Sequence, residues 1–374
     1  MNNILFLTNK LLIGGAEMIF VNQINLIDKN KFNPFVGLLY STNKKDNLYH
    51  KLKISDNKII HFNFKQKLGA LDIGGIIRLT KFLRQNKIDI IFTSLFEANF
   101  AGRLAAKFAG TKVIVSSEHS CYYDKRYWQK KVDWFLSFFT DKIVAVSNEV
   151  ADFTSKQEKI DSKKFKVIKQ ISDISIEGIF NRNELRRQFD IPINAFVCGS
   201  LGRFSPEKAQ YKIIDMAEIL VYDLKIKDIY FIIIGYGALH DELLRLIAVK
   251  KLEKYVKIIK DPGLAKEYLV MLDIFILTSI REGFGIVLLE AMNNGLPCIA
   301  FNVGGVSEVI RDKESGFLID NNHKQDFINK ILFFYKNKSL MHEFSLRSKK
   351  SVDSILGKIE DLEIFFMSLW KSKK

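Results

Sequence analysis

Short apolar runs alternate with amphipathic stretches along the first half of the chain. The amphipathic stretches, at residues 16–27, 75–85 and 98–109, repeat their apolar positions at the spacing of a helix. The apolar runs have the length and composition of strands, and they lie at Ile4–Thr8, Phe35–Tyr40, Lys58–Phe62, Ile88–Thr93, Lys112–Ser116 and Lys142–Val146. Strands that alternate with helices in this way predict a parallel, doubly wound sheet.

The same alternation begins again in the second half. The predicted strands there are Phe196–Leu201, Tyr230–Ile234, Val256–Ile259, Ile274–Thr278, Pro297–Phe301 and Gly316–Ile319. A chain of 374 residues is also too long for one ordinary core. We therefore predict an α/β protein with two Rossmann-like domains, at residues 1–175 and 176–350, followed by a C-terminal helical segment at 351–374.

That C-terminal segment predicts a single helix from about Val352 to Trp370. Its apolar residues return at helical spacing and are Val352, Ile355, Leu356, Ile359, Leu362, Phe366 and Leu369. On the pattern alone, the simplest interpretation is an ordinary packing helix.

Composition narrows the class of protein. Apolar residues make up 48% of the chain, which is typical of a globular protein. The net charge is +15, and the first 180 residues carry most of this excess. A basic half favours an anionic partner, such as a membrane surface, a pyrophosphate-linked lipid or nucleic acid, although a general bias toward lysine would give the same charge. The three cysteines are scattered without a zinc-binding pattern, so we expect a cytoplasmic protein.

The segment from Arg281 to Met292 carries the strongest chemical signal. It places Glu282 and Glu290 eight residues apart around a Gly-Phe-Gly turn, directly after a predicted buried strand. Glycines let a backbone approach a ligand closely, and the free N–H groups of a helix start suit a phosphate. The residues after Gly285 predict a helix start, which puts Glu282 at the turn and Glu290 deeper on the helix. On a helix, eight residues is a little over two turns, so Glu290 falls near the face that carries residues close to Glu282. The alternative is that Glu282 merely caps the helix.

This segment resembles the E-x7-E signature of the retaining glycosyltransferases of GT-B fold, the GT4-type family of glycosyl transferases group 1. Other segments follow in that family's order, so the resemblance covers most of the chain. It implies two Rossmann-like domains whose parallel sheets face each other across a cleft, and a terminal helix that packs back on the first domain. It also implies that the second domain binds a nucleotide-sugar, with Glu282 contacting the sugar hydroxyls as a catalytic residue and Glu290 holding the ribose.

Further donor-binding residues follow from the same resemblance. Arg203 and Lys208 lie in the loop after the first strand of the second half, where open α/β sheets bind ligands, and they resemble the family's diphosphate-binding pair. The developing charge on a leaving diphosphate needs such cations. The complete predicted donor set is Gly15, Arg203, Lys208, Gly235, Gly237, Gly283, Phe284, Gly285, Ile286 and Glu290.

The first half contributes residues of a second kind. Gly14, Gly15 and Glu17 follow the first strand, and they resemble the family's first glycine-rich loop, near the donor phosphate and the acceptor. His119 follows the fifth strand at a position where the resemblance implies a catalytic contact with the donor sugar. We also predict that Glu97 points into the same region as Gly14 and Glu17, where the acceptor binds.

No cofactor or metal is expected. The chain has no Asp-x-Asp triplet, which enzymes that hold a diphosphate through a divalent ion usually display. The scattered His and Cys residues offer no alternative ligand set. We therefore predict that Arg203, Lys208 and helix N-termini replace the ion.

An aromatic and basic segment predicts contact with an anionic membrane surface. Residues 122–131 interleave tyrosines and a tryptophan with lysines and arginine, and residues 132–139 continue with Trp134 and several phenylalanines. This composition suits an interface between water and anionic lipid. A core helix with a solvated charged end is the alternative.

Together these features predict a glycosyltransferase that moves a sugar, from a UDP-sugar, to a polyprenyl-diphosphate-linked glycan acceptor. The expected pathway is the synthesis of a bacterial surface polysaccharide, such as O-antigen, lipopolysaccharide or capsule, on the inner face of the cytoplasmic membrane. The alternatives are a sugar-nucleotide epimerase of the same fold and a non-enzymatic polyanion-binding or nucleic-acid-binding protein. The latter leaves the paired glutamates unexplained.

Overall fold

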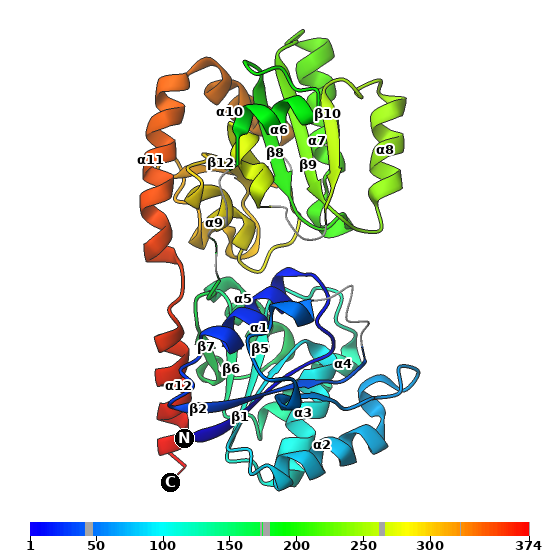
Figure 1. Ribbon diagram of the computed structural model, residues 1–374, viewed down its shortest axis with the longest axis vertical. Coiled ribbons are helices and arrows are strands. Elements are labelled where there is room, and N and C mark those ends of the chain that lie inside the picture. The colour runs from blue at the N-terminus through cyan, green and yellow to red at the C-terminus, as the bar shows by residue number, and fades with distance from the viewer. Residues whose placement is uncertain (42–47, 173, 175–179, 262–265, 322, 374) are drawn as a thin grey trace. The chain divides into compact units, whose positions relative to one another are not determined.

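A computed structural model describes residues 1–41, 48–172, 174, 180–261, 266–321 and 323–373. The chain divides into two compact units, of which the first comprises Met1–Asp173 with Gly357–Lys374, and the second Ile174–Leu356 (Figure 1). The last segment of the chain therefore returns to the first unit. The domain boundary predicted between residues 175 and 176 lies outside the described residues.

The first unit is built on a seven-stranded parallel sheet with strand order β3-β2-β1-β4-β5-β6-β7. The strands are β1 (Asn2–Thr8), β2 (Phe32–Leu38), β3 (Ile59–His61), β4 (Ile90–Ser94), β5 (Val113–Glu118), β6 (Lys142–Ala145) and β7 (Phe165–Val167). Six of them overlap the predicted strands. The apolar pattern missed β7 because its three residues are only partly buried or exposed, and Lys166 interrupts the apolar run.

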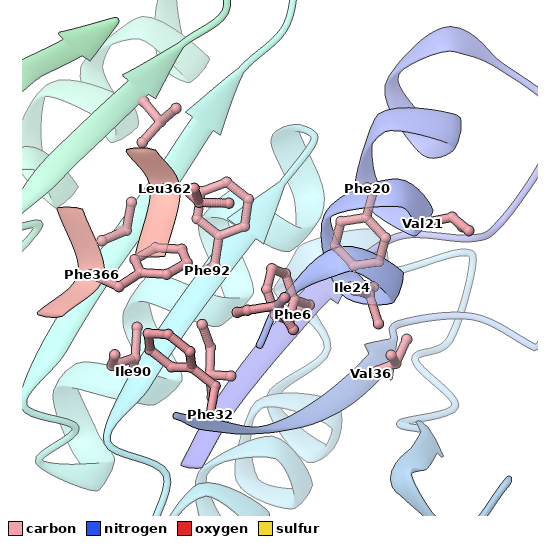
Figure 2. Packing of buried hydrophobic residues seen from close by; sticks show 14 of the residues in the cluster. Phe6, Phe20, Val21, Ile24, Phe32, Val36, Ile90, Phe92, Leu362 and Phe366 are labelled. Atoms are coloured by element: carbon pink, nitrogen blue, oxygen red, sulfur yellow. The ribbon is translucent and has the colours of Figure 1, made fainter. Parts of the chain in front are cut away.

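In the part of this unit that the structure describes, there are six α-helices: α1 (Gly15–Leu26), α2 (Ile73–Gln85), α3 (Phe96–Ala109), α4 (Tyr127–Ser137), α5 (Asn148–Glu158) and α12 (Ile359–Lys371). The last of these completes a hydrophobic core on one side of the sheet (Figure 2). There Phe366 packs edge-to-face on Phe92, with ring centroids 5.5 Å apart, and on Phe6 at 6.4 Å, and all three rings are fully buried. Buried edge-to-face rings contribute about 0.5–1.5 kcal/mol per pair beyond the burial of their area.

The prediction of one helix from Val352 to Trp370 is wrong. α11 (Lys338–Ile355) ends in the second unit, and α12 starts at Ile359 in the first. Between them Leu356 is extended, and the Gly357 N–H donates to the Gln170 carbonyl oxygen at 2.9 Å. A Cβ on Gly357 would lie 2.1 Å from the Lys169 carbonyl oxygen, so the backbones approach too closely for another residue. The apolar residues keep their helical spacing across this break between α11 and α12. The sequence pattern therefore does not show the break, which only these long-range contacts reveal.

The second unit contains a six-stranded parallel sheet with order β10-β9-β8-β11-β12-β13. The strands are β8 (Phe196–Leu201), β9 (Ile229–Gly235), β10 (Val256–Lys260), β11 (Ile274–Leu277), β12 (Cys298–Phe301) and β13 (Gly316–Ile319), and all six overlap the predicted strands. Its α-helices are α6 (Arg182–Gln188), α7 (Tyr211–Glu218), α8 (His240–Val249), α9 (Ile286–Asn293), α10 (Lys324–Lys336) and α11.

Both sheets reverse their strand order at one place, which is between β1 and β4 in the first unit and between β8 and β11 in the second. At such a reversal, the loops after the two strands leave toward opposite faces and open a crevice at the carboxyl edge of the sheet. Each unit is therefore a Rossmann-like α/β domain, as predicted. The candidate site of each unit lies in the loops at the carboxyl edge of its sheet.

Candidate functional site

In the second unit, the loops that follow β8 and β11 are tied together by hydrogen bonds. The Thr278 hydroxyl, just after β11, donates to the carbonyl oxygens of Lys208 and Ala209, each at 3.2 Å. The Ile280 N–H donates to the Glu207 carbonyl oxygen at 2.8 Å. Lys208 lies in the short 3₁₀ helix η6 (Pro206–Lys208), which these bonds hold against the loop that carries Glu282.

Lys208 and Glu282 form an ion pair across these two loops, between the Lys208 Nζ and the Glu282 Oε1. The Ser279 hydroxyl donates to the same carboxylate oxygen at 2.8 Å. The Lys208 side chain is 23% exposed and that of Glu282 is 9% exposed, so the pair is sheltered but reachable from solvent. Arg203, in the same loop as Lys208, is exposed. The fold thus brings together two residues that the sequence places 74 positions apart.

The predicted helix start after Gly285 is confirmed, because α9 begins at Ile286, and Glu282 lies in the loop before it as predicted. Glu290 lies on α9, is buried, and has the Lys266 Nζ at 3.4 Å from its Oε1. Each glutamate therefore has its own lysine. Glu282 can therefore contact a ligand from the loop, and Glu290 from the helix.

The turn between these glutamates starts α9. Gly285 has φ +86°, a left-handed conformation that favours glycine, and it is the N-cap of the helix. Ile286 is the first helical residue, so its N–H and those after it belong to the helix start. The Phe284 side chain is buried, which leaves only its backbone for a ligand. Of the predicted donor residues in this turn, Gly283, Phe284 and Gly285 can therefore act through main-chain groups.

Gly235 and Gly237, at and after the end of β9, allow this part of the chain to pack closely against the loop after β8. A Cβ on Gly235 would lie 2.0 Å from the Gly202 carbonyl oxygen, and one on Gly237 would lie 2.4 Å from that of Phe204. Both have φ near +150° (144° and 152°), and the Phe204 N–H donates to the Tyr236 carbonyl oxygen at 2.7 Å. These glycines hold the Arg203 loop against the end of β9, and their donor-binding role stays a prediction.

In the first unit, the predicted residues follow three adjacent strands. Gly14 is the N-cap of α1 after β1, Glu97 is in the first turn of α3 after β4, and His119 follows β5. Glu17 lies in the first turn of α1. A Cβ on Gly15 would meet no atom within 4 Å, so space is open beside the start of α1. Because β1, β4 and β5 are neighbours, these residues share one edge of the sheet.

The His119 imidazole is neutral at neutral pH. Its Nε2 lies 2.8 Å from the Ser94 hydroxyl and 3.0 Å from the Ser117 hydroxyl. Its Nδ1 is buried and has no hydrogen-bond partner among the described residues. Burial lowers the pKa of His119 to about 4. The side chain can therefore exchange hydrogen bonds but does not supply a positive charge.

The sequence did not reveal a buried ion cluster behind this edge. Arg103 of α3 pairs with Asp133 of α4, and both side chains are 2% exposed. The Lys125 Nζ lies 3.0 Å from Asp133, 3.4 Å from Glu118 and 2.5 Å from Glu158, on carboxylate oxygens. Burial raises the pKa of Glu118, and it raises that of Glu158 to about 8, although Lys125 opposes both shifts. Lys125 therefore belongs to the interior, not to the basic membrane-facing surface predicted for residues 122–131.

Lys266 and Ser279, which contact the two glutamates, were also not predicted from the sequence. A lone lysine in a loop and a serine at a strand end give no signal in the sequence, because only the fold shows which carboxylate they reach. Among the described residues, no group of three or more His, Cys, Asp or Glu side chains is placed to hold a metal ion. Within the same residues, none of the helices combines the length and the apolar character needed to span a bilayer.

Two Rossmann-like domains with parallel sheets are the fold of the GT-B glycosyltransferases. Residues 181–351 match the family model described as Glycosyl transferases group 1, and residues 13–173 match Glycosyltransferase Family 4. The two matches together span most of the chain, which therefore belongs to the glycosyl transferases group 1. It is a glycosyltransferase, and the epimerase and polyanion-binding alternatives are not supported.

Glycosyltransferases are among the proteins similar to this chain in sequence, and a solved structure shares its fold. The chain is 28% identical over 270 residues to an Escherichia coli UDP-Gal:alpha-D-GlcNAc-diphosphoundecaprenol alpha-1,3-galactosyltransferase, a match that covers 70% of each chain. It is 29% identical over 119 residues to the E. coli O-antigen biosynthesis glycosyltransferase WclY, which covers 32% of each. The structure of Anabaena Alr3699/HepE in complex with UDP-glucose has the same fold, with a TM-score of 0.85, 22% identity and full coverage of both chains.

Proposed function

We propose that this glycosyltransferase transfers a sugar from a UDP-sugar, with retention of configuration, to a polyprenyl-diphosphate-linked glycan. The product would serve the synthesis of a bacterial surface polysaccharide such as O-antigen, lipopolysaccharide or capsule. The observation that carries the proposal is the Lys208–Glu282 pair at the carboxyl edge of β8 and β11. The donor and acceptor classes are supported by the relatives named above, whose names include a UDP-sugar, a diphosphoundecaprenol acceptor and O-antigen synthesis.

On the donor side, the proposal assigns the diphosphate to Arg203, Lys208 and the N-terminus of α9. A lysine, an arginine and helix N–H groups oppose the charge that develops on the leaving diphosphate, which is the demand that a metal ion meets in other enzymes. Glu282 accepts hydrogen bonds from the sugar hydroxyls and Glu290 from the ribose hydroxyls. The pairing of Lys208 with Glu282 keeps both groups at the junction of the diphosphate and the sugar.

On the acceptor side, the neutral imidazole of His119 exchanges hydrogen bonds with the donor sugar. Gly14, Glu17 and Glu97 are assigned to the acceptor. For retention, the acceptor hydroxyl attacks on the face of the leaving group, and the departing phosphate takes its proton. Water must be excluded from such a site, because it would otherwise hydrolyse the donor.

The proposal includes attachment to the anionic inner surface of the membrane through α4. Tyr127, Trp128, Phe135 and Phe138 are 74%, 48%, 56% and 64% exposed, an unusual density of aromatic rings on one short helix and its end. The Lys131 Nζ lies 5.5 Å from the centroid of the Tyr127 ring. Exposed rings beside cations favour the interface of an anionic bilayer.

A donor screen followed by a transfer assay tests the proposal. Thermal shift with UDP-, GDP- and TDP-sugars should select UDP-sugars, and the selected donors should then react with polyprenyl-diphosphate glycans in excess chelator. The anomeric configuration of the product, measured by NMR, should match that of the donor. Loss of activity in chelator with recovery in magnesium or manganese would disprove the metal-independent part. Preference for a GDP- or TDP-sugar would disprove the donor, and an inverted product would disprove retention.

A further inference from the structure

A groove of about 640 Å³ runs between α2 and α3 in the first unit. Ile73, Ile77, Lys81 and Arg84 of α2 line it on one side, and Leu104 and Phe108 of α3 on the other. Ile73, Ile77 and Phe108 are 72%, 61% and 58% exposed. Burial of such side chains in an apolar environment is favourable. Adjoining exposed apolar side chains of this size mark an interaction surface.

The charges at this groove have one sign. The charged residues that line it are Lys81 and Arg84, and Lys107 stands beside Phe108 near the end of α3. Arg78 of α2 is not part of the lining and pairs with Asp72 at 3.6 Å. The Arg84 guanidinium donates to the Phe108 carbonyl oxygen and so lies across the C-terminal end of α3. An apolar groove with cations along its wall complements a ligand that joins a hydrocarbon chain to an anionic head.

α3, which lines this groove, also contacts the aromatic residues at the end of α4. The Lys107 Nζ lies 5.8 Å from the centroid of the Phe139 ring, and that ring packs edge-to-face on Phe135 at 5.3 Å. α3 packs against α2 on one flank and against α4 on the other. The one acidic residue of α4, Asp133, is buried in its pair with Arg103 and adds no negative charge to the surface.

The position of the cations favours a membrane phospholipid over the glycan acceptor. α2 connects β3 to β4, so its C-terminal part, with Lys81 and Arg84, lies toward the amino edge of the sheet. The candidate site lies at the opposite, carboxyl edge. A phosphate held by Lys81 and Arg84 is therefore remote from His119 and Glu97.

We propose that the groove between α2 and α3 binds an acyl chain of an anionic phospholipid, with the lipid phosphate against Lys81 and Arg84. This would immerse the surface formed by α2, α3 and α4 in the membrane interface. The inference deepens the proposed membrane attachment and rests on it, but it does not depend on the identity of the donor or the acceptor.

A fluorescent label in the groove tests this proposal in the full chain. Ile77→Cys would carry an NBD label, since the three native cysteines, Cys121, Cys198 and Cys298, are buried. Val249→Cys on α8, where the side chain is 80% exposed, is the matched control. On vesicles of phosphatidylglycerol and phosphatidylcholine, we expect the Ile77 label to shift to the blue. A nitroxide on acyl carbon 12 should quench it more strongly than one on the headgroup, and the Val249 label should not change.

Binding measurements complete the test. The double variant Ile73→Asn/Ile77→Asn should weaken binding to phosphatidylglycerol vesicles about tenfold or more, because two apolar side chains lose their burial in the lipid. Ile364→Asn, on an exposed position of α12, should leave binding unchanged. Hydrolysis or transfer of the UDP-sugar in solution should be the same in all variants, so loss of the lipid site and failure of the proposed function are distinguishable.

Four outcomes would overturn the proposal. The first two are that the protein stays unbound on phosphatidylglycerol vesicles, or that the bound protein keeps its Ile77 label in water. The third is that the label responds only to polyprenyl diphosphate, which would make the groove an acceptor site. The fourth is that the label shifts with protein concentration in the absence of lipid, which would make the groove an interface between copies of the chain.

Discussion

Each unit contains an ion pair that joins segments far apart in the sequence, but the two pairs differ in their exposure to solvent. Arg103 and Asp133 are each 2% exposed, whereas Lys208 and Glu282 are 23% and 9% exposed. The first pair fixes α3 against α4 and has no access to a ligand. The second lies in loops at the carboxyl edge of a sheet. The same chemistry therefore supports packing in one unit and a candidate site in the other.

Neighbouring groups strengthen this difference. Around Arg103, the remaining charges of the cluster are also buried, so each one depends on its partners for solvation. Near Lys208 in the chain, Arg203 is exposed, and α9 begins four residues after Glu282. The comparison predicts that mutations in the first cluster change stability and that mutations in the second change turnover.

The largest expected effect is on the stability of the first unit. Arg103→Met keeps most of the side-chain volume but leaves the buried Asp133 with Lys125 alone. We expect the free energy of unfolding to fall by about 3–5 kcal/mol, as for other buried pairs that lose one partner. Chemical denaturation followed by circular dichroism measures this change.

Arg347→Met is the matched control for that substitution. Arg347 pairs with Glu343 at 3.2 Å on the surface of α11, where the two side chains are 46% and 60% exposed. Surface pairs contribute about 0.2–1 kcal/mol, so the control should remain close to wild type. Equal destabilisation in both variants would remove the contrast between buried and exposed pairs.

A slightly smaller effect is expected on catalysis in the second unit. Lys208→Met retains the aliphatic stem and removes the charge, so turnover of the UDP-sugar should fall roughly a hundredfold, the scale of losing one group that stabilises the transition state. Stability should change little, because Ser279 still donates to Glu282. Steady-state kinetics and thermal denaturation measure the two quantities on the same sample.

Lys313→Met provides the comparison for this variant, since the Lys313 side chain is 77% exposed and its Nζ lies 3.9 Å from a carboxylate oxygen of the adjacent Asp312. It should keep wild-type turnover. Near-wild-type kcat in Lys208→Met would exclude Lys208 from the chemistry.

The smallest effect concerns pH and His119. Burial lowers its pKa to about 4 in the folded protein, whereas the unfolded chain takes up a proton near the ordinary value of 6.5. Between these values the unfolded state binds more protons, so stability rises with pH and falls on acidification. His119→Gln should reduce the loss at pH 5 by roughly 1–2 kcal/mol. Unfolding curves at pH 5 and pH 7 measure the difference, and identical pH dependence in both proteins would contradict the neutral imidazole.

The strands were predictable because parallel strands buried on both faces are almost wholly apolar. β8 matches its predicted bounds, and β9 to β13 lie within one residue of theirs at each end. β7 escaped because an edge strand with partly exposed residues lacks that signal. The single long C-terminal helix was wrong, since Gly357 breaks it through contact with Lys169 and Gln170, which are far away in the sequence.

Sequence alone determined the alternation of strands and helices, the two-domain α/β architecture and the family, because local hydrophobic periodicity and short motifs carry that information. Tertiary structure alone decided which charges meet. It paired Lys208 with Glu282, gave Glu290 its neighbour Lys266, buried Lys125 and left His119 neutral. Charge pairing and pKa depend on distance and burial in three dimensions, and no spacing along the chain encodes either one.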